Sequence, residues 1–532
     1  MTQNRYEARL LARFCAIPGR TWAAVCAALL VGVLAHLAAL TGLIVNGDSM
    51  VPVVSGKWLL SQGKWANGFF ADMRGTVNLT IVTGPISLLW LALSAGLTVS
   101  SLDIKSPALC ALCGAMMATF PSVVCTFLYN APDIFFFSLL LSVCAVYVTR
   151  KYRFGFVSGA LLLAVSIGVY QAYVGMAAGL LLLAVLCDLL AGKKPVRRTL
   201  LDGCKYIGVL LAGVLLYYLA LQAVLAAKGG ALQAYRGIDH MGEFTVSSLA
   251  GAAAAAYRKV LLFFAYDQYG VIGGGMGAAL YLSTLAACAA LFAVQTVRTR
   301  LYARPGALLL TLLLTGLMPL AIHAVAVLGQ NAETHWLMIY AVVLVFVAML
   351  KLADLCAQPI DQEAARAPAA GAKGEAARFA CKAAPALLSV ALVCSWYLIT
   401  TQNYARMRLS YEGAFGTASV IAAGVLAQPS FSGETPVAMI GGITEERADF
   451  RYLDNFTGSF DKDYLFNSWV VQNMITRYVQ VEMQFVSVEE KERLLETQAF
   501  ADMPVYPDNG YIGEIDGMIV VKLAENEPII FG

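Results

Sequence analysis

The chain has 532 residues, of which 59% are apolar and only 13% are charged. Soluble globular proteins carry about 25% charged residues, so this composition excludes an ordinary soluble domain and predicts a polytopic membrane protein. The net charge of +3 is too small to suggest a nucleic-acid partner.

Apolar runs recur along the first 401 residues. A spanning helix needs about 20 mainly apolar residues. We expect eleven such spans, and therefore an α-helical membrane body over residues 1–401. The predicted spans are 22–45, 77–100, 107–129, 132–149, 154–171, 173–191, 204–226, 276–296, 306–329, 335–353 and 383–401.

Four basic clusters set the predicted orientation. Lys and Arg gather in the cytoplasmic loops of membrane proteins, and with eleven spans all four clusters fall on the side of the N-terminus. We therefore expect the N-terminus to be cytoplasmic. The clusters lie at 5–20, 150–153, 192–198 and 298–304.

The same count places three long segments outside the membrane and one inside. The first external loop is expected at 46–76, and a second at 227–275, with an interfacial or re-entrant helix over 257–270. The Ala-rich segment 357–382 is expected to be a flexible cytoplasmic linker. Residues 402–532 are expected to form an extracytoplasmic tail.

The tail differs in composition from the membrane body. It carries nine Lys/Arg and nineteen Asp/Glu, a net charge of −10, against +13 for the rest of the chain, and it contains no cysteine. Segments 435–442 and 517–523 have strand character. The segment 486–500 has helical periodicity, with Ser487 as cap and Glu490 three residues later. We expect a small α/β domain.

Asp48 is the first candidate for chemistry, because it follows the first span by only three residues. It could be a solvated acid that ends the helix. Alternatively, it could be a general base at the outer surface of the membrane, where a soluble hydroxyl and a lipid headgroup can meet.

Two Lys-Trp pairs follow, seven residues apart. On one helix, seven residues make two turns, so Lys57 is expected above Lys64, and Trp58 above Trp65. This spacing predicts a single interfacial amphipathic helix with tryptophans at headgroup level. Either it only lies on the surface, or one of its lysines also meets a lipid phosphate.

Further candidate groups lie at the expected outer face. Asp72 and Arg74 could pair with each other, or Arg74 could bind a phosphate. Asp133 follows Pro132 at a helix start, where it could act as a cap or as a second active-site acid. Arg258 could anchor to an anionic lipid or form a specific phosphate site.

Tyr170 and Gln171 lie at the expected outer end of the fifth span. The tyrosine could belong to the aromatic belt of the membrane. Tyr and Gln together could also hold sugar hydroxyls, because an amide in a membrane segment needs partners. No His, Cys or Asp cluster has metal-ligand spacing, so no cofactor is identified, although a divalent cation shared by outer acids is an open alternative.

Together these pieces resemble the polytopic bacterial glucosyltransferase family whose founding members decorate O-antigen and convert serotype. The resemblance rests on NGD (46–48), SQGKW (61–65), VYQAY (169–173) and the tail segment 503–523. The chain departs from the family in two places. The family's Asp-Asp pair is a single Asp48 here, beside Gly47 and Ser49, and the Arg of its Gly-Arg-Trp is Lys64.

The resemblance implies a GT-C-like, lipid-linked-donor glycosyltransferase in the bacterial cytoplasmic membrane. The donor would be a polyprenyl-phosphate sugar, with glucose expected, and the acceptor a cell-surface glycan, with inversion in one displacement. Asp48 would act as base, alone or with Asp72 or Asp133. The remaining site residues that the resemblance implies are Lys64, Arg74, Arg258 and Lys57 for the phosphate, and Tyr170, Gln171 and Asn46 for the sugar.

Two other functions are compatible with the sequence. A transporter or flippase for lipid-linked glycans is the main alternative, but transporters place ionisable residues near the middle of the bilayer. Here the acids gather at the expected outer edge, which favours an enzyme. A sensor or assembly protein that binds a partner through its tail is the second alternative.

Overall fold

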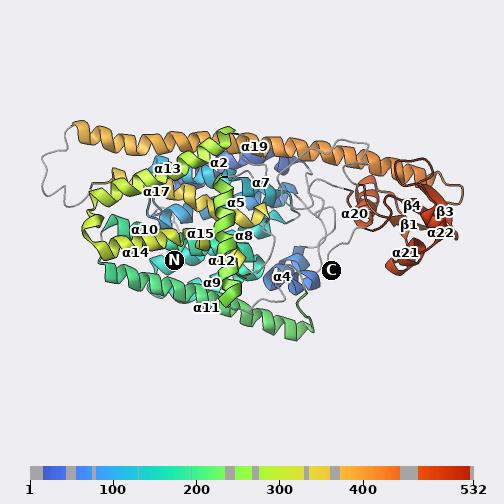
Figure 1. Ribbon diagram of the computed structural model, residues 1–532, viewed down its shortest axis with the longest axis horizontal. Coiled ribbons are helices and arrows are strands. Elements are labelled where there is room, and N and C mark those ends of the chain that lie inside the picture. The colour runs from blue at the N-terminus through green and yellow to red at the C-terminus, as the bar shows by residue number, and fades with distance from the viewer. Residues whose placement is uncertain are drawn as a thin grey trace, which may run out of the picture.

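A computed structural model gives the structure of the protein. The residues that it describes are 16–42, 56–74, 80–129, 131–192, 194–233, 246–265, 275–328, 335–359, 372–443 and 465–527. Within these ranges the chain is mostly helical, and a small sheet lies beyond one end of the helical bundle (Figure 1).

Nine spans in the described part of the chain are long and apolar enough to cross a membrane. A tenth is possible if the two helices α6 (Pro107–Thr119) and α7 (Pro121–Phe127), which are bent by 47°, form one crossing. The nine are α2 (Gly19–Thr41), α5 (Thr80–Ser101), α8 (Pro132–Lys151), η2 (Gln171–Tyr173) with α10 (Val174–Ala191), α11 (Val196–Lys228), α13 (Gly275–Arg298), α14 (Pro305–Gly316) with α15 (Met318–Ile322), η4 (Trp336–Val342) with α17 (Val343–Ala357), and α19 (Ala372–Leu426).

A further apolar helix, α9 (Gly155–Val169), is shorter than these. Every one of the eleven expected spans coincides with one of the helices above, which confirms a multi-pass helical protein. The number of crossings stays a prediction, because α9 and the α6–α7 pair do not meet the length and straightness of the others.

Helices outside these spans are short or lie across the bundle. The helix α12 (Val246–Ala265) runs across the long axis of the molecule, along which α11 and α19 extend (Figure 1). It packs against α13, α15 and α16. The short helices of this part are α3 (Gly56–Ser61), α4 (Trp65–Arg74), η3 (Leu301–Ala303) and α16 (Val325–Leu328).

Glycines let the N-terminal helices approach closely. A Cβ atom at Gly114 of α6 would stand 2.1 Å from the backbone oxygen of Ala24 on α2, and one at Gly96 of α5 would stand 2.6 Å from Val25. Any side chain would force these helices apart. Small residues at crossings bring membrane helices into contact in this way, and α2, α5 and α6 form a tightly packed unit.

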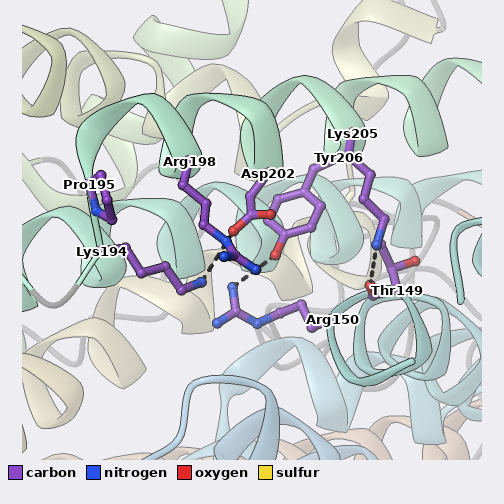
Figure 2. Close-up of a pocket in the computed structure, with 8 residues that line it drawn as sticks. All are labelled: Thr149, Arg150, Lys194, Pro195, Arg198, Asp202, Lys205 and Tyr206. Carbon is purple, nitrogen blue, oxygen red and sulfur yellow. Dashed lines mark hydrogen bonds and ion pairs between the residues drawn. The ribbon is translucent and has the colours of Figure 1, made fainter. Parts of the chain in front are cut away.

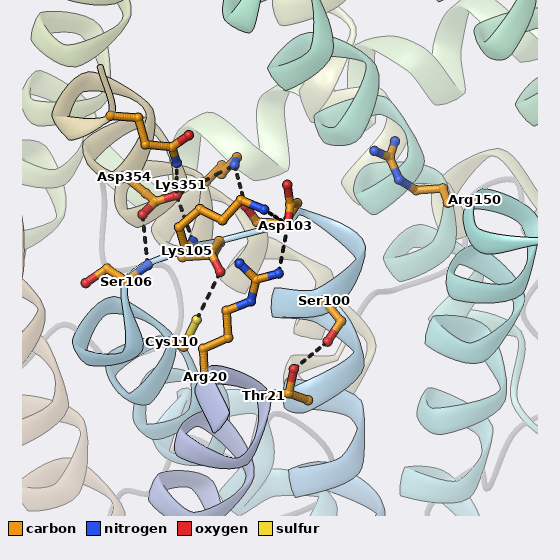
Figure 3. Close-up of polar contacts among 12 residues, drawn as sticks. Arg20, Thr21, Ser100, Asp103, Lys105, Ser106, Cys110, Arg150, Lys351 and Asp354 are labelled. Carbon is orange, nitrogen blue, oxygen red and sulfur yellow. Dashed lines mark hydrogen bonds and ion pairs between the residues drawn. The ribbon is translucent and has the colours of Figure 1, made fainter. Parts of the chain in front are cut away.

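At one end of the bundle, charged side chains tie the loops together (Figure 3). Asp103, between α5 and α6, pairs with Arg20 at 3.0 Å and with Lys105 at 2.6 Å, and its backbone oxygen accepts from Lys351 at 3.0 Å. Burial opposes ionisation of Asp103. The three cations outweigh that effect and lower the pKa of its carboxyl below the usual value.

Asp354, near the end of α17, caps another helix from outside. Its two carboxylate oxygens accept the backbone N–H groups of Lys105 and Ser106 at 3.0 and 3.1 Å, at the start of α6. A helix N-terminus carries partial positive charge and unpaired N–H donors, which a carboxylate satisfies. This contact fastens α17 to the α5–α6 turn.

The last span continues far beyond the expected membrane boundary. Helix α19 has 55 residues, so it extends for about 80 Å. The boundary expected at 401–402 falls inside it, and so do residues 372–382 of the linker expected at 357–382. Figure 1 shows α19 running alongside the bundle and on to the small sheet.

A four-stranded sheet with the order β2-β1-β4-β3 lies at the far end of α19. β1 pairs in parallel with β2 and β4, whereas β3 and β4 are antiparallel. The strands are β1 (Pro436–Ile440), β2 (Gln484–Phe485), β3 (Ile512–Ile515) and β4 (Met518–Lys522), and the helices beside them are α20 (Ser468–Asn473), η5 (Met474–Val479), α21 (Val488–Leu495) and α22 (Gln498–Ala501).

The expected strands and cap in this region are confirmed. β1 and β4 lie in the two segments predicted as strands. Ser487 caps α21 in a capping box with Glu490. The helical segment predicted over 486–500 consists of two helices: α21 ends at Leu495, and Thr497 caps the separate helix α22, which ends at Ala501.

Candidate functional site at the α3–α4 hairpin

The two Lys-Trp pairs lie on two short helices, so the prediction of one amphipathic helix is wrong. Gly63 has φ of +74°, a left-handed conformation that ends α3. The N–H groups of Gly63 and Lys64 bond the backbone oxygens of Leu60 and Leu59, both at 2.9 Å, which is the Schellman pattern. Lys57 and Lys64 therefore do not stack.

Three other parts of the chain hold the turn between α3 and α4. The amide of Gln171 donates to the backbone oxygen of Gln62 at 3.0 Å, and the hydroxyl of Tyr217 on α11 donates to that of Gly63, also at 3.0 Å. The N–H of Gln233 donates to the backbone oxygen of Ser61 at 3.1 Å. The turn is fixed against two spans and the segment after α11.

Lys64 follows this turn directly and has a defined position. Its ammonium nitrogen lies 2.8 Å from the side-chain oxygen of Gln62 and 5.9 Å from the centre of the Tyr170 ring. A cation at that distance from an aromatic ring gains electrostatic stabilisation. The structure thus brings together Lys64, Tyr170 and Gln171, three of the residues proposed from the sequence.

Tyr170 and Gln171 lie at a break between spans. Helix α9 ends at Val169, and the 3₁₀ turn η2 follows. The hydroxyls of Ser138 and Ser142 on α8 donate to the backbone oxygens of Ser166 and Tyr173, at 2.8 and 2.7 Å. Irregular backbone at membrane depth needs such partners.

The aromatic-belt interpretation of Tyr170 is wrong, because its side chain is buried. Tyr170 is 3% exposed and its neighbour Tyr173 is 1% exposed. The Tyr170 ring meets Phe135 edge-on at 4.7 Å and Tyr173 at 5.5 Å. It therefore packs in the interior beside Lys64 and does not face lipid tails.

Helix α4 packs closely on the neighbouring spans. A Cβ atom at Gly168 of α9 would stand 2.5 Å from the Trp65 ring, so only glycine allows this contact. Phe70 meets Phe137 of α8 edge-on at 5.7 Å, and Trp90 of α5 meets the same ring. The hairpin is thus fixed on α8 and α9.

Two of the three candidate acids are described. Asp133 lies in the first turn of α8, as expected, with one buried carboxylate oxygen, and it precedes Phe135 by two residues. Asp72 is exposed on α4, with its carboxylate against Gly56 of α3. Asp48 and Asn46 lie outside the described residues. The side chain of Arg74 is not described either, so the predicted pairing of Arg74 with Asp72 stays a prediction.

Lys57 and Arg258, the other candidate cations whose side chains are described, lie on other helices, α3 and α12. Lys57 is exposed on α3, on the far side of the Gly63 turn. Arg258 is exposed on α12, whose packing partners are α13, α15 and α16, whereas α4 packs on α9 and α11. Among the described residues, no group of three or more His, Cys, Asp or Glu side chains could hold a metal ion.

Sequence reasoning missed two residues of the site, Gln62 and Tyr217. Gln62 contributes its side chain to Lys64 and its backbone oxygen to Gln171. The glycine at 63 in SQGKW signals a turn, and a turn next to a polar side chain could have pointed to Gln62. Nothing in the sequence near Tyr217 links it to residue 63.

The chain was compared with known protein families and proteins. The family described as glucosyl transferase GtrII matches residues 37–346, which is more than half of the chain. The match spans the hairpin, the helix break and α12, and it ends near the start of α17. No curated protein and no solved structure matches the chain.

Proposed function

The chain belongs to the GtrII glucosyl transferase family, and on that premise we propose that it transfers glucose from a polyprenyl-phosphate donor to a cell-surface glycan. As a member of this family, with many apolar helices, it is a membrane-bound glucosyltransferase. The proposal adds the donor, the outer face of the bacterial cytoplasmic membrane as the place of reaction, and an inverting mechanism.

One observation carries the proposal: the fixed position of Lys64 beside the buried Tyr170 and the helix break. In the proposed reaction, the bond between the sugar C1 and the phosphate oxygen breaks, and the phosphate leaves with the electron pair. Preorganised positive charge at a developing anion lowers the barrier more than mobile charge does. Among the candidate phosphate ligands whose side chains the structure describes, Lys64 is better placed than Arg258 and Lys57, and Arg74 is a further candidate.

The acceptor hydroxyl would attack C1 from the opposite face and lose its proton to Asp48. Seven residues lie between Asp48 and the first residue of α3, so base and cation belong to one loop of the chain. Asp133 is the favoured second acid, because it lies two residues before Phe135, whose ring contacts that of Tyr170. Asp72 is the other candidate. Tyr170, Gln171 and Asn46 would contact the sugar.

The positions of the charges support the proposed orientation. Arg20, Arg150, Lys194 and Arg298 are joined by contacts among loops at one end of the bundle. In Figure 1 the helix α4 and the sheet lie toward the other end, where α11 finishes. The positive-inside rule makes the basic end cytoplasmic and the hairpin external.

The role of Lys64 can be tested with labelled polyprenyl-phosphate glucose and purified full-length protein. Lys64→Met is expected to slow donor consumption by about 100-fold or more, in the range found for loss of one preorganised electrostatic group. Lys64→Arg should retain most activity, because it keeps the charge. Lys57→Met is the matched control, since Lys57 is exposed on the preceding helix, and it should behave like wild type.

If Lys57→Met and Lys64→Met slowed donor consumption to the same extent, the specific role assigned to Lys64 would be wrong. If the wild-type protein moves labelled lipid across the bilayer of proteoliposomes without consuming any donor, the flippase alternative replaces the transferase proposal.

A further inference from the structure

A pocket of about 380 Å³ lies among the basic loops, at the opposite end of α8 from Asp133, and Figure 2 shows its lining residues. The end of α8, the turn after α10 and the first turns of α11 surround it. Its volume falls within the range of roughly 300–1,000 Å³ that is typical of small-molecule sites. The lining residues are Thr149, Arg150, Lys194, Pro195, Arg198, Asp202, Lys205 and Tyr206.

The pocket has more positive than negative charge. Lys194 pairs with Asp188 at 2.8 Å and with Asp202 at 3.2 Å, and Arg150 pairs with Asp188 at 3.6 Å. Arg198 makes no ion pair within the described part of the chain. Four cations therefore meet two carboxylates, and the excess of positive charge favours an anionic group such as a phosphate.

The cations are held together and are not spread into water. Arg150 lies 3.4 Å from the Tyr206 hydroxyl and over its ring, and Lys205 donates to the backbone oxygen of Thr149 at 3.0 Å. In Figure 2 the side chains of Arg150, Lys194 and Arg198 point toward one another. The positive-inside rule requires only that Lys and Arg lie in the cytoplasmic loops, and it does not require that their side chains converge on one pocket. Like charges that converge in a hollow repel one another, which an anion between them would offset.

The opposite face of α11 is apolar. Arg198, Asp202, Lys205 and Tyr206 follow helical spacing along one face of α11. Leu200, Ile207 and Leu211, which are exposed large hydrophobic residues, follow the same spacing along the other face, about 180° away. The exposed apolar face is the one that a bilayer would cover, so the pocket lies on the inner side of a membrane helix, and basic pockets between membrane helices bind lipid headgroups elsewhere.

We propose that this pocket binds the anionic phosphate group of a membrane lipid headgroup or of a soluble phosphate ester at the cytoplasmic face. The site is separate from the proposed glucosyl-transfer site, at the other end of α8. Binding is measurable without any sugar donor, so this inference can fail or succeed independently of the proposed function.

Native mass spectrometry of the full-length protein can test the proposal. Dioleoyl phosphatidylglycerol is titrated against dioleoyl phosphatidylcholine, and glycerol phosphate is titrated in a separate series. The wild-type protein should retain phosphatidylglycerol in preference to phosphatidylcholine. The double variant Arg198→Gln/Lys205→Gln should bind it about tenfold more weakly, because each basic group near an anionic headgroup contributes appreciably to binding.

Arg197→Gln is the matched control, since Arg197 is exposed next to the pocket but does not line it. Equal affinity for glycerol phosphate and the lipid, with the same loss in the double variant, would support phosphate binding and identify a soluble source. Equal binding of both lipids, or equal weakening in the control and the double variant, would overturn the proposal. If the double variant does not fold, Arg198→Gln alone serves the same comparison.

Discussion

Lys64 acquires its defined position from neighbours in two separate parts of the chain, the α3–α4 turn and the break after α9. Gln62 accepts from its ammonium group, Tyr170 lies beneath it, and Gln171 holds the backbone of the turn. A lysine has only a flexible stem and a point charge. Its effect on a leaving phosphate therefore depends on how well these neighbours fix it.

Gln171→Leu should weaken this arrangement. The substitution removes the hydrogen bond to the backbone oxygen of Gln62, which is buried. Loss of one partner of a buried hydrogen bond costs about 1–2 kcal/mol. Chemical denaturation in mixed micelles should show this decrease in the free energy of unfolding, together with slower donor consumption. Gln402→Leu, on an exposed face of α19, is the control, and a decrease of the same size in both would argue against a specific role for Gln171.

Asp103 gives the protein a pH-dependent stability. The pKa of its carboxyl is lowered in the folded state by Lys105, Arg20 and Lys351, which outweigh its burial. Its contribution is therefore fully present above the unfolded pKa of about 3.9 and is lost as the pH falls through the folded pKa. Asp103→Asn should lower the melting temperature at pH 7 and have progressively less effect as the pH decreases below 4. A difference that is constant from pH 7 to pH 3 would contradict this assignment.

The α3–α4 hairpin and the break between α9 and η2 form one packed unit of secondary structure. Helices α3 and α4 are short, and they hold their positions through contacts with α8, α9 and α11. Isolated helices of six and ten residues are not stable in water. Their structure therefore depends on the tight contact between Trp65 and Gly168 and on the bonds to the turn.

Gly168→Ala should displace α4. The added methyl group would stand 2.5 Å from the Trp65 ring, and overpacking of this kind costs about 1–3 kcal/mol. Gly208→Ala is the control, because nothing lies within 4 Å of its position on α11. Thermal unfolding should show a loss for Gly168→Ala alone, and the second-site change Trp65→Leu should restore part of it. If Gly168→Ala caused no loss of thermal stability, or if Trp65→Leu restored none of it, the position of the hairpin would not depend on this contact.

Sequence patterns predicted the spans well and the loops poorly, for physical reasons. Apolar runs such as 22–45 and 335–353 identify helices because length and hydrophobicity alone determine whether a segment can span. The two Lys-Trp pairs suggested one helix because seven residues make two turns, but the single left-handed Gly63 overrides that periodicity. Tyr170 looked like a belt residue because burial by Phe135 and Tyr173 arises from tertiary packing, which the local sequence does not encode.

The whole molecule has two ends with different chemistry. Loops tied by Arg20, Asp103 and Asp354, and the basic pocket, lie at one end, whereas the hairpin lies toward the other. Helix α19 continues past the bundle to the sheet (Figure 1), and this part lies outside the family match. The family match covers most of the helical bundle, and the sheet lies outside it.

The most direct test of the account uses proteoliposomes that contain full-length protein and labelled polyprenyl-phosphate glucose. The account predicts that the wild-type protein consumes the donor, and that Asp48→Asn abolishes consumption while its expression, insertion and unfolding temperature remain unchanged. Asp72→Asn is measured beside it as a second candidate acid, on α4, and it should keep at least partial activity. Unchanged consumption by Asp48→Asn would contradict the assigned base, and no consumption by the wild-type protein would contradict the lipid-phosphate donor.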